Sequence, residues 1–173
     1  MITIRFATTA DAALIADMSR QTFYETFAAS NTKEDMDKFM NEVFTRDALM
    51  EEVEKGMGIF LLAYDGDEPL GYVRMRESQN PASFAGASAI EIARIYAMSS
   101  AIGKGVGKAL MNACIEIATE RKKDIIWLGV WEHNERAISF YKKWGFEKFD
   151  THVFVLGNDP QTDWLMKKTL STT

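Results

Sequence analysis

The sequence between Glu91 and Leu110, EIARIYAMSSAIGKGVGKAL, passes from strand-forming residues through a run of glycines into a helical pattern. Isoleucine and tyrosine favour β-strands. The apolar residues that begin at Leu110 recur at helical spacing as far as Ala118. This part of the chain therefore predicts a strand, a tight turn and a helix in direct succession.

The turn carries three alternating glycines, Gly103, Gly105 and Gly107, with Lys104 and Lys108 beside them. Glycines let successive backbone N–H groups approach one ligand, because no Cβ atom is in the way. The helix that follows directs the positive end of its dipole toward the same place. The pattern predicts a binding site for a phosphate or pyrophosphate. A tight turn without a ligand is the alternative that the glycines alone leave open.

Two common nucleotide-binding motifs do not match this turn. A Walker loop has four residues between its first glycine and a Gly-Lys-Ser/Thr sequence, and that sequence is absent. The dinucleotide fingerprint Gly-x-Gly-x-x-Gly also fails, because Gly107 comes one residue too early.

Composition predicts one domain that spans residues 1–173, with 47% hydrophobic and 26% charged residues. The formal net charge of −5 argues against non-specific nucleic-acid binding and is compatible with a cationic substrate. The single cysteine, Cys114, excludes an intrachain disulfide bond. We expect no metal site, because only His133 and His152 accompany this cysteine. Neither histidine has a recognisable partner in the sequence.

The first residues, MITIRF, alternate as a strand does and do not resemble a signal peptide. No apolar run is long enough to cross a membrane. We therefore expect a cytoplasmic protein without a membrane partner. Hydrophobic periodicity predicts further strands over 1–6, 58–64, 70–77, 124–130, 146–156 and 163–170. It predicts helices over 10–27, after Thr32, over 47–55 and from His133 to Trp144, with Thr32 as the expected cap of the second. This order predicts a mixed sheet flanked by helices.

A second motif follows the strand at 124–130. Asn134 lies just after this strand, and Tyr141 lies seven residues further on, two helical turns along the same face. Both side chains are therefore expected on one side of the helix, close to the glycine turn if the two strands are neighbours.

With these two motifs in this order, the chain resembles the GNAT superfamily of acetyl-CoA-dependent N-acetyltransferases. The resemblance implies an α/β (α+β) fold with a mixed, mostly antiparallel sheet of about seven strands flanked by helices. It implies that the backbone of Ile95, Tyr96 and Ala97 binds the pantetheine arm of coenzyme A. The residues implied to bind the pyrophosphate are Gly103, Lys104, Gly105, Val106, Gly107 and Lys108. Asn134 and Tyr141 are also implied to contact the cofactor. The chain departs from the family at Ile102, where glutamine or arginine is usual.

Direct attack of an amine on the acetyl thioester needs a base and an acid. Glu91 is the candidate base, with a solvent-facing strand residue as the alternative. Tyr141 is the candidate acid for the leaving thiolate, with a packed aromatic as the alternative. The stretches 125–134 and 152–163 resemble bacterial PaiA-type spermidine/spermine N-acetyltransferases. That resemblance implies a polyamine substrate, for which Glu25, Glu34 and Asp35 are candidate ammonium partners.

Two other functions remain open at this point. One is acetylation of a protein or peptide, and the other is a non-catalytic acyl-CoA-binding module that regulates a partner. A homodimer is also possible, because exposed final strands often pair in the family that this chain resembles.

Overall fold

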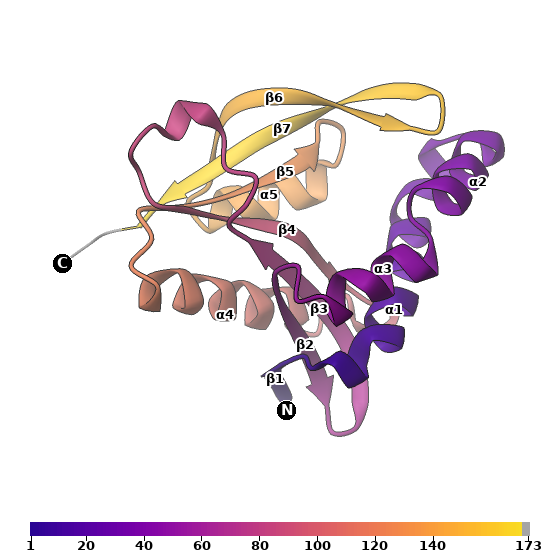
Figure 1. Ribbon diagram of the computed structural model, residues 1–173, viewed down its shortest axis with the longest axis horizontal. Coiled ribbons are helices and arrows are strands. Elements are labelled where there is room, and N and C mark those ends of the chain that lie inside the picture. Colours follow the sequence, from indigo (N-terminus) through magenta and orange to yellow (C-terminus); the bar gives the residue numbers. More distant parts are fainter. Residues whose placement is uncertain (171–173) are drawn as a thin grey trace.

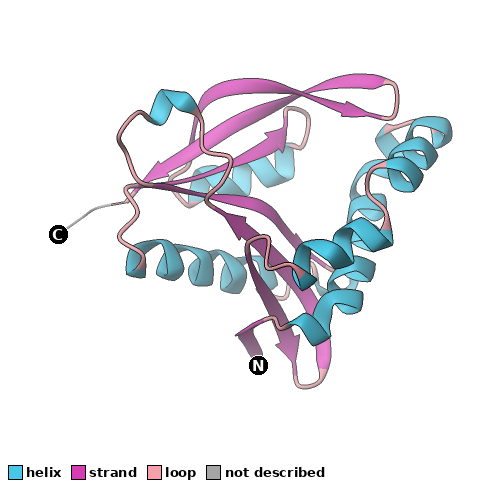
Figure 2. Cartoon of the chain, in the orientation of Figure 1, coloured by secondary structure: helices cyan, strands magenta, loops and turns pink. Residues whose placement is uncertain are grey.

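The apolar runs of the sequence form the strands of one twisted sheet in a computed structural model that describes residues 1–170 (Figures 1 and 2). Residues 171–173, the end of the expected single domain, lie outside the described residues. The strands are β1 (Ile2–Phe6), β2 (Ile59–Asp65), β3 (Glu68–Arg76), β4 (Ala89–Ala97), β5 (Ile125–Trp131), β6 (Glu147–Leu156) and β7 (Asp159–Thr169). Their order in the sheet is β1-β2-β3-β4-β5-β7-β6. The mixed, mostly antiparallel sheet of the expected fold is thereby confirmed.

Five α-helices cover the two faces of this sheet: α1 (Ala12–Phe27), α2 (Lys33–Glu42), α3 (Arg46–Glu54), α4 (Val106–Glu120) and α5 (Glu135–Lys143). Helices α4 and α5 bury their apolar residues in the main core, with Leu110 and Met111 fully buried. Helices α1 and α3 pack on the opposite face, where Ile15 and Val53 contact Leu62 and Tyr72. The cap expected at Thr32 is present, since its side chain accepts a hydrogen bond from the backbone of Asp35 over 3.1 Å.

Strands β4 and β5 form the one parallel pair among the described strands. Their pairing runs from Ala89 opposite Ile125 to Ile92 opposite Leu128 and stops there. Beyond that point β4 pairs with β3 alone, and β5 pairs with β7 alone. The two central strands therefore diverge along their C-terminal halves.

The C-terminal hairpin differs from the sequence expectation. The loop expected over 157–160 is a two-residue turn of Gly157 and Asn158, and β7 begins at Asp159 instead of Asp163. Pro160 pairs with Val155 at the outer end of the hairpin. Gly157 adopts a φ of +65°, a backbone angle that glycine tolerates well. Two-residue hairpin turns need such positive φ angles, so the glycine allows a short turn between two long strands.

Candidate active site

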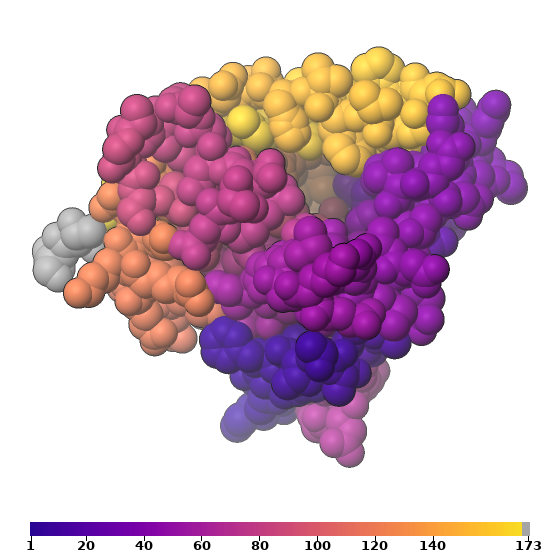
Figure 3. Space-filling model, viewed as in Figure 1, coloured from indigo at the N-terminus to yellow at the C-terminus, as the bar shows by residue number. Residues whose placement is uncertain are grey.

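The divergence of β4 and β5 opens toward a hollow in the molecular surface. Figure 3 shows this hollow between the C-terminal hairpin (yellow), the helices α2 and α3 (purple) and the loop before β4 (magenta). The hairpin and α2 are joined across its rim, because Asn158 donates a backbone hydrogen bond to Asp35 over 3.0 Å. The predicted site residues on β4, the glycine turn and α5 all lie on the elements that meet at the divergence.

Ile95, Tyr96 and Ala97 lie in the diverging half of β4. They pair with Val73, Tyr72 and Gly71 of β3. The opposite edge of this half-strand faces β5 and has no strand partner within residues 1–170. Backbone polar groups on such an edge are free to bind an extended ligand as a further strand would. This placement is what the expected contact with a pantetheine arm requires, although the contact itself stays a prediction.

The glycine-rich turn leads directly into α4. Gly103 and Gly105 have φ angles of +88° and +84°, which side chains rarely tolerate. Gly105 caps the helix, and the first helical hydrogen bond runs from Ala109 N–H to Gly105 over 3.0 Å. The N–H groups of the intervening residues 106–108 therefore precede the helical ladder and remain available to an anion. A Cβ atom on Gly107 would lie 3.6 Å from Phe140 on α5, which is an ordinary contact distance.

Lys104 and Lys108 line a surface pocket beside this turn, together with Asp65, Leu70 and Asn112. The two lysines supply positive charge next to the free N–H groups. Ile102 is 45% exposed and adds no polar group. Binding of a pyrophosphate would therefore depend on the backbone and the lysines.

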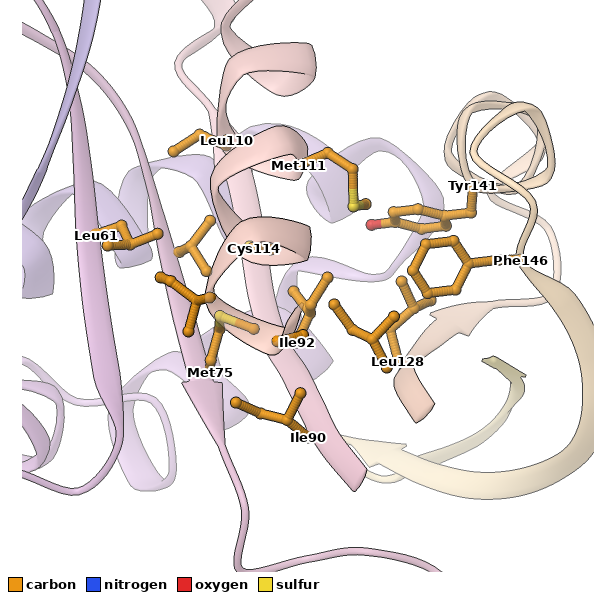
Figure 4. Packing of buried hydrophobic residues seen from close by; sticks show 14 of the residues in the cluster. Leu61, Met75, Ile90, Ile92, Leu110, Met111, Cys114, Leu128, Tyr141 and Phe146 are labelled. Atoms are coloured by element: carbon orange, nitrogen blue, oxygen red, sulfur yellow. The ribbon is translucent and has the colours of Figure 1, made fainter. Parts of the chain in front are cut away.

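Asn134 and Tyr141 lie at the start and in the last turn of α5. Asn134 is the N-cap of this helix, and its side-chain oxygen accepts a hydrogen bond from Ala137 N–H over 3.3 Å. Tyr141 is buried, with its phenol oxygen directed toward α4 beside Met111 (Figure 4). Burial raises the pKa of Tyr141 above its usual range, so the phenol stays protonated at physiological pH. A group held in this state can donate a hydrogen bond to a developing anion.

Glu91 lies in the paired half of β4, opposite Trp127 of β5. It is 7% exposed, and Arg76 of β3 contacts both of its carboxylate oxygens, with Nε–Oε1 and Nη2–Oε2 distances of 2.5 and 3.3 Å. The structure therefore places this residue in an ion pair just before the divergence, not exposed to solvent. Its expected role as a base stays a prediction.

Arg94, also on β4, belongs to a charged network that fixes α3 to the sheet. Its guanidinium and that of Arg74 both contact the carboxylate of Glu52 on α3. The ring of Phe44 lies 5.5 Å from the Arg94 guanidinium carbon. These contacts give Arg94 a structural role.

The three acids expected to bind ammonium groups lie in different environments. Glu25 is exposed on α1, and hydrogen bonds from Gln21 and then Ser99 lower its pKa. Glu34 is exposed in the first turn of α2. Asp35 binds the turn of the C-terminal hairpin, because its carboxylate accepts the hydrogen bond from Asn158 N–H. The turn packs so closely that a Cβ atom on Gly157 would lie 2.5 Å from the Cα atom of Asp35. Their expected role in binding stays a prediction.

The structure brings together a further pair that sequence reasoning missed. His152 on β6 lies opposite Asp163 on β7, with 3.4 Å between Nε2 and Oδ2. Burial raises the pKa of Asp163, and the charge of His152 acts against this rise. The absence of a partner for His152 in the sequence analysis is thereby corrected. The only available signal was the alternation along the hairpin, which depends on the exact length of its turn.

Comparison with known proteins agrees with this arrangement. The family model described as Acetyltransferase (GNAT) family matches residues 20–146. The chain belongs to the GNAT family. An uncharacterized N-acetyltransferase encoded in the pepI 3′ region of Lactobacillus delbrueckii subsp. lactis is 41% identical over 154 residues, which are 88% of each chain. A spermidine N(1)-acetyltransferase of Thermoplasma acidophilum is 24% identical over 87% of this chain and 91% of its own length.

Solved GNAT structures have the same fold. The PaiA N-acetyltransferase of Thermoplasma acidophilum, in complex with coenzyme A, superposes with a TM-score of 0.78 at 23% identity and covers 98% of this chain and 99% of its own. The putative acetyltransferase YncA of Salmonella typhimurium, with acetyl-CoA, gives a TM-score of 0.75 at 19% identity. It covers 100% of this chain and 96% of its own. Coenzyme A and acetyl-CoA are the ligands named for these two structures.

Over residues 1–170, no helix combines the length and the apolar character that crossing a bilayer requires. In the same part of the chain, no three His, Cys, Asp or Glu side chains gather as metal ligands would.

Proposed function

We propose that this acetyl-CoA-dependent N-acetyltransferase acetylates a primary amine of a small molecule, and that the molecule is a polyamine such as spermidine or spermine. The observation that carries the proposal is the divergence of β4 and β5 beside a glycine turn with free N–H groups. The polyamine assignment is supported by the similarity to the Thermoplasma spermidine N(1)-acetyltransferase. The net charge of −5 is compatible with such a cation.

In this proposal the chain binds its cofactor mainly through the backbone. Acetyl-CoA, when bound, supplies the acetyl thioester. The free edge of Ile95–Ala97 binds the pantetheine arm, and one N–H of this strand polarises the thioester carbonyl. The turn from Gly103 to Lys108 binds the pyrophosphate. Asn134 adds a contact to the arm through the amide group that its capping bond leaves free.

Tyr141 is proposed to assist departure of the thiolate. Because burial keeps the phenol protonated, it can always offer a hydrogen bond to the sulfur. Glu91, acting through a water molecule, is the sequence-derived candidate for the base. Glu25, Glu34 and Asp35 are the candidate partners of the distal ammonium groups.

Release of coenzyme A in the presence of acetyl-CoA and an amine panel tests the function. The panel contains spermidine, spermine, amino acids, aminoglycosides and peptides with free N-termini or lysines. Turnover with polyamines supports the proposal, and turnover with peptides alone replaces the polyamine by a protein substrate. Binding of acetyl-CoA without turnover on any amine indicates a non-catalytic regulatory module.

Tyr141→Phe tests the proposed acid. We expect kcat to fall at least tenfold while the Kd for acetyl-CoA changes less than twofold, because the ring and its packing are retained. Unchanged kcat removes Tyr141 from the mechanism.

A further inference from the structure

The His152–Asp163 pair lies on the hairpin wall of the divergence, outside the residues that the GNAT motifs assign. Asp163 is opposite Trp131, in the half of β5 that has left β4. The pair therefore lies beside the half of β5 that has no pairing with β4. The side chain of His152 is 45% exposed and that of Asp163 is 18% exposed.

Gly129 of β5 lies beside this pair. It is the first residue of β5 after the paired segment ends at Leu128. A Cβ atom on Gly129 would lie 3.8 Å from Cε1 of His152 and 3.9 Å from Oδ2 of Asp163. The imidazole thus turns Cε1, the carbon between its two nitrogens, toward Gly129.

The backbone does not require a glycine here. Gly129 does not have a positive φ angle. Glycine inside a strand weakens the strand by about 0.5–1 kcal/mol and often marks a close approach of another group. A larger side chain at this position would stand between the histidine and the diverging strands, so the glycine keeps that space open.

We propose that His152 is the catalytic base that takes a proton from the acceptor ammonium group, that Asp163 positions its imidazole, and that Gly129 leaves room for the acceptor amine. This inference rests on the proposed function and names the base for it. A carboxylate beside Nε2 favours the tautomer with the proton on that nitrogen, and Nδ1 then keeps the lone pair that accepts a proton. Histidine is the side chain suited to this exchange near neutral pH.

The alternative base is less free to act. Both oxygens of Glu91 are engaged by Arg76, and the residue is 7% exposed. A carboxylate in such a pair would have to leave its guanidinium partner to accept a proton. Within residues 1–170, Asp163 contacts His152 and forms no ion pair with a lysine or arginine.

The protons balance as follows. The ammonium group gives one proton to His152, and the neutral nitrogen forms the amide bond while the bond between carbonyl carbon and sulfur breaks. The nitrogen loses a second proton as the amide forms. Of the two protons, one ends on the thiol of coenzyme A, where Tyr141 assists, and the other passes to solvent when His152 is reset.

Asp163 faces His152 from β7. Strand β5 contributes Gly129 to the contact. Among residues 1–170, Asp163 is the charged side chain that contacts His152.

The test measures kcat/KM for the best amine of the panel from pH 5 to 9. In His152→Gln we expect kcat/KM to fall about 10²-fold or more. We also expect loss of the rising limb, the increase of kcat/KM with pH between about pH 5 and 8, where imidazole changes charge. In Asp163→Asn we expect a smaller fall in kcat/KM and a rising limb that is shifted along the pH axis. The reason is that the imidazole is retained but is no longer oriented by a carboxylate. His133→Gln is the matched control, since His133 also lies near a carboxylate, 3.9 Å from Glu132, and should keep the wild-type profile.

Gly129→Val gives an independent arm that does not remove a polar group. Valine suits a strand, so the melting temperature should hold while kcat/KM falls about tenfold or more and the Kd for acetyl-CoA stays within twofold. If the wild type is active and His152→Gln keeps the wild-type kcat/KM and the rising limb of the pH profile, this inference is overturned while the proposed function stands. The same conclusion follows if the rising limb is lost in Glu91→Gln instead. A wild type that releases no coenzyme A with any amine overturns the proposed function and this inference with it.

Discussion

Gly71 controls how closely α4 approaches the sheet, and replacing it with alanine should weaken both the fold and the cofactor site. A Cβ atom there would lie 2.7 Å from the carbonyl oxygen of Tyr96, 2.9 Å from Val106 and 3.2 Å from Leu110. Tyr96 is backbone of the diverging strand, and the other two residues form the first turns of α4. None of the three can rotate away freely, because Val106 and Leu110 are buried.

The expected size follows from these distances. Ordinary carbon contacts are about 3.5–4.0 Å, so Val106 must move by about 0.6 Å or more. Overpacking of this kind costs about 1–3 kcal/mol. For a chain of this length each kcal/mol lowers the melting temperature by about 2–4 °C, which predicts a fall of about 2–12 °C. The same movement displaces the N–H groups of residues 106–108, so we expect the Kd for acetyl-CoA to rise about tenfold.

Thermal unfolding and calorimetric titration with acetyl-CoA measure the two effects. Gly129→Ala is the matched control, since it is also a strand glycine but its new Cβ atom meets nothing closer than 3.6 Å. It should keep its melting temperature. A Gly71→Ala protein with wild-type melting temperature and wild-type affinity would refute the argument that this glycine sets the position of α4.

Three further changes probe other contacts. Glu52→Gln leaves Arg74 and Arg94 without their shared carboxylate and should lower the urea-derived free energy of unfolding by about 2–3 kcal/mol, whereas Glu51→Gln, on the exposed side of α3, should change it by less than about 0.5 kcal/mol. Hydrogen bonds from Arg5 hold the pKa of Asp11 at about 2, so its stabilisation is present at neutral pH and is lost as the pH falls from about 4 toward 2. The stability gap between wild type and Asp11→Asn should therefore narrow in that window, and a gap that is constant with pH would contradict the ion pair. Burial raises the pKa of the Cys114 thiol to about 12, so an aromatic disulfide reagent should modify it only when the protein is unfolded in urea. Rapid labelling of the native protein would contradict this burial.

Local patterns in the sequence were enough to predict the elements on which the site is built. The glycines of the turn, the helical spacing after Leu110 and the cap at Thr32 are all short-range signals, and each of these elements is present. Boundaries were less accurate. The helix expected to start at residue 10 begins as a 3-10 turn, Thr9–Asp11, with Thr8 as its cap, because Thr8 and Asp11 hydrogen-bond to each other's backbone.

Contacts between distant segments could not be read from the sequence. The ion pair of Glu91 with Arg76 depends on the register of β3 against β4, which is interrupted by a bulge near Met75. The pairing of His152 with Asp163 depends on a two-residue turn, and the predicted four-residue loop would have given a different register. In each case one residue of register decides which side chains meet.

The end of the β4–β5 pairing has a consequence for the history of the sequence. The edge that it exposes consists of main-chain groups, and point substitutions change side chains but leave almost every N–H and C=O in place. Cofactor recognition through the backbone is therefore retained after most substitutions. The walls of the hollow consist of side chains, so substitutions there change the contacts that an amine can make. Lineages that share the fold at low identity can thus keep one acyl donor while each changes the amine that it accepts.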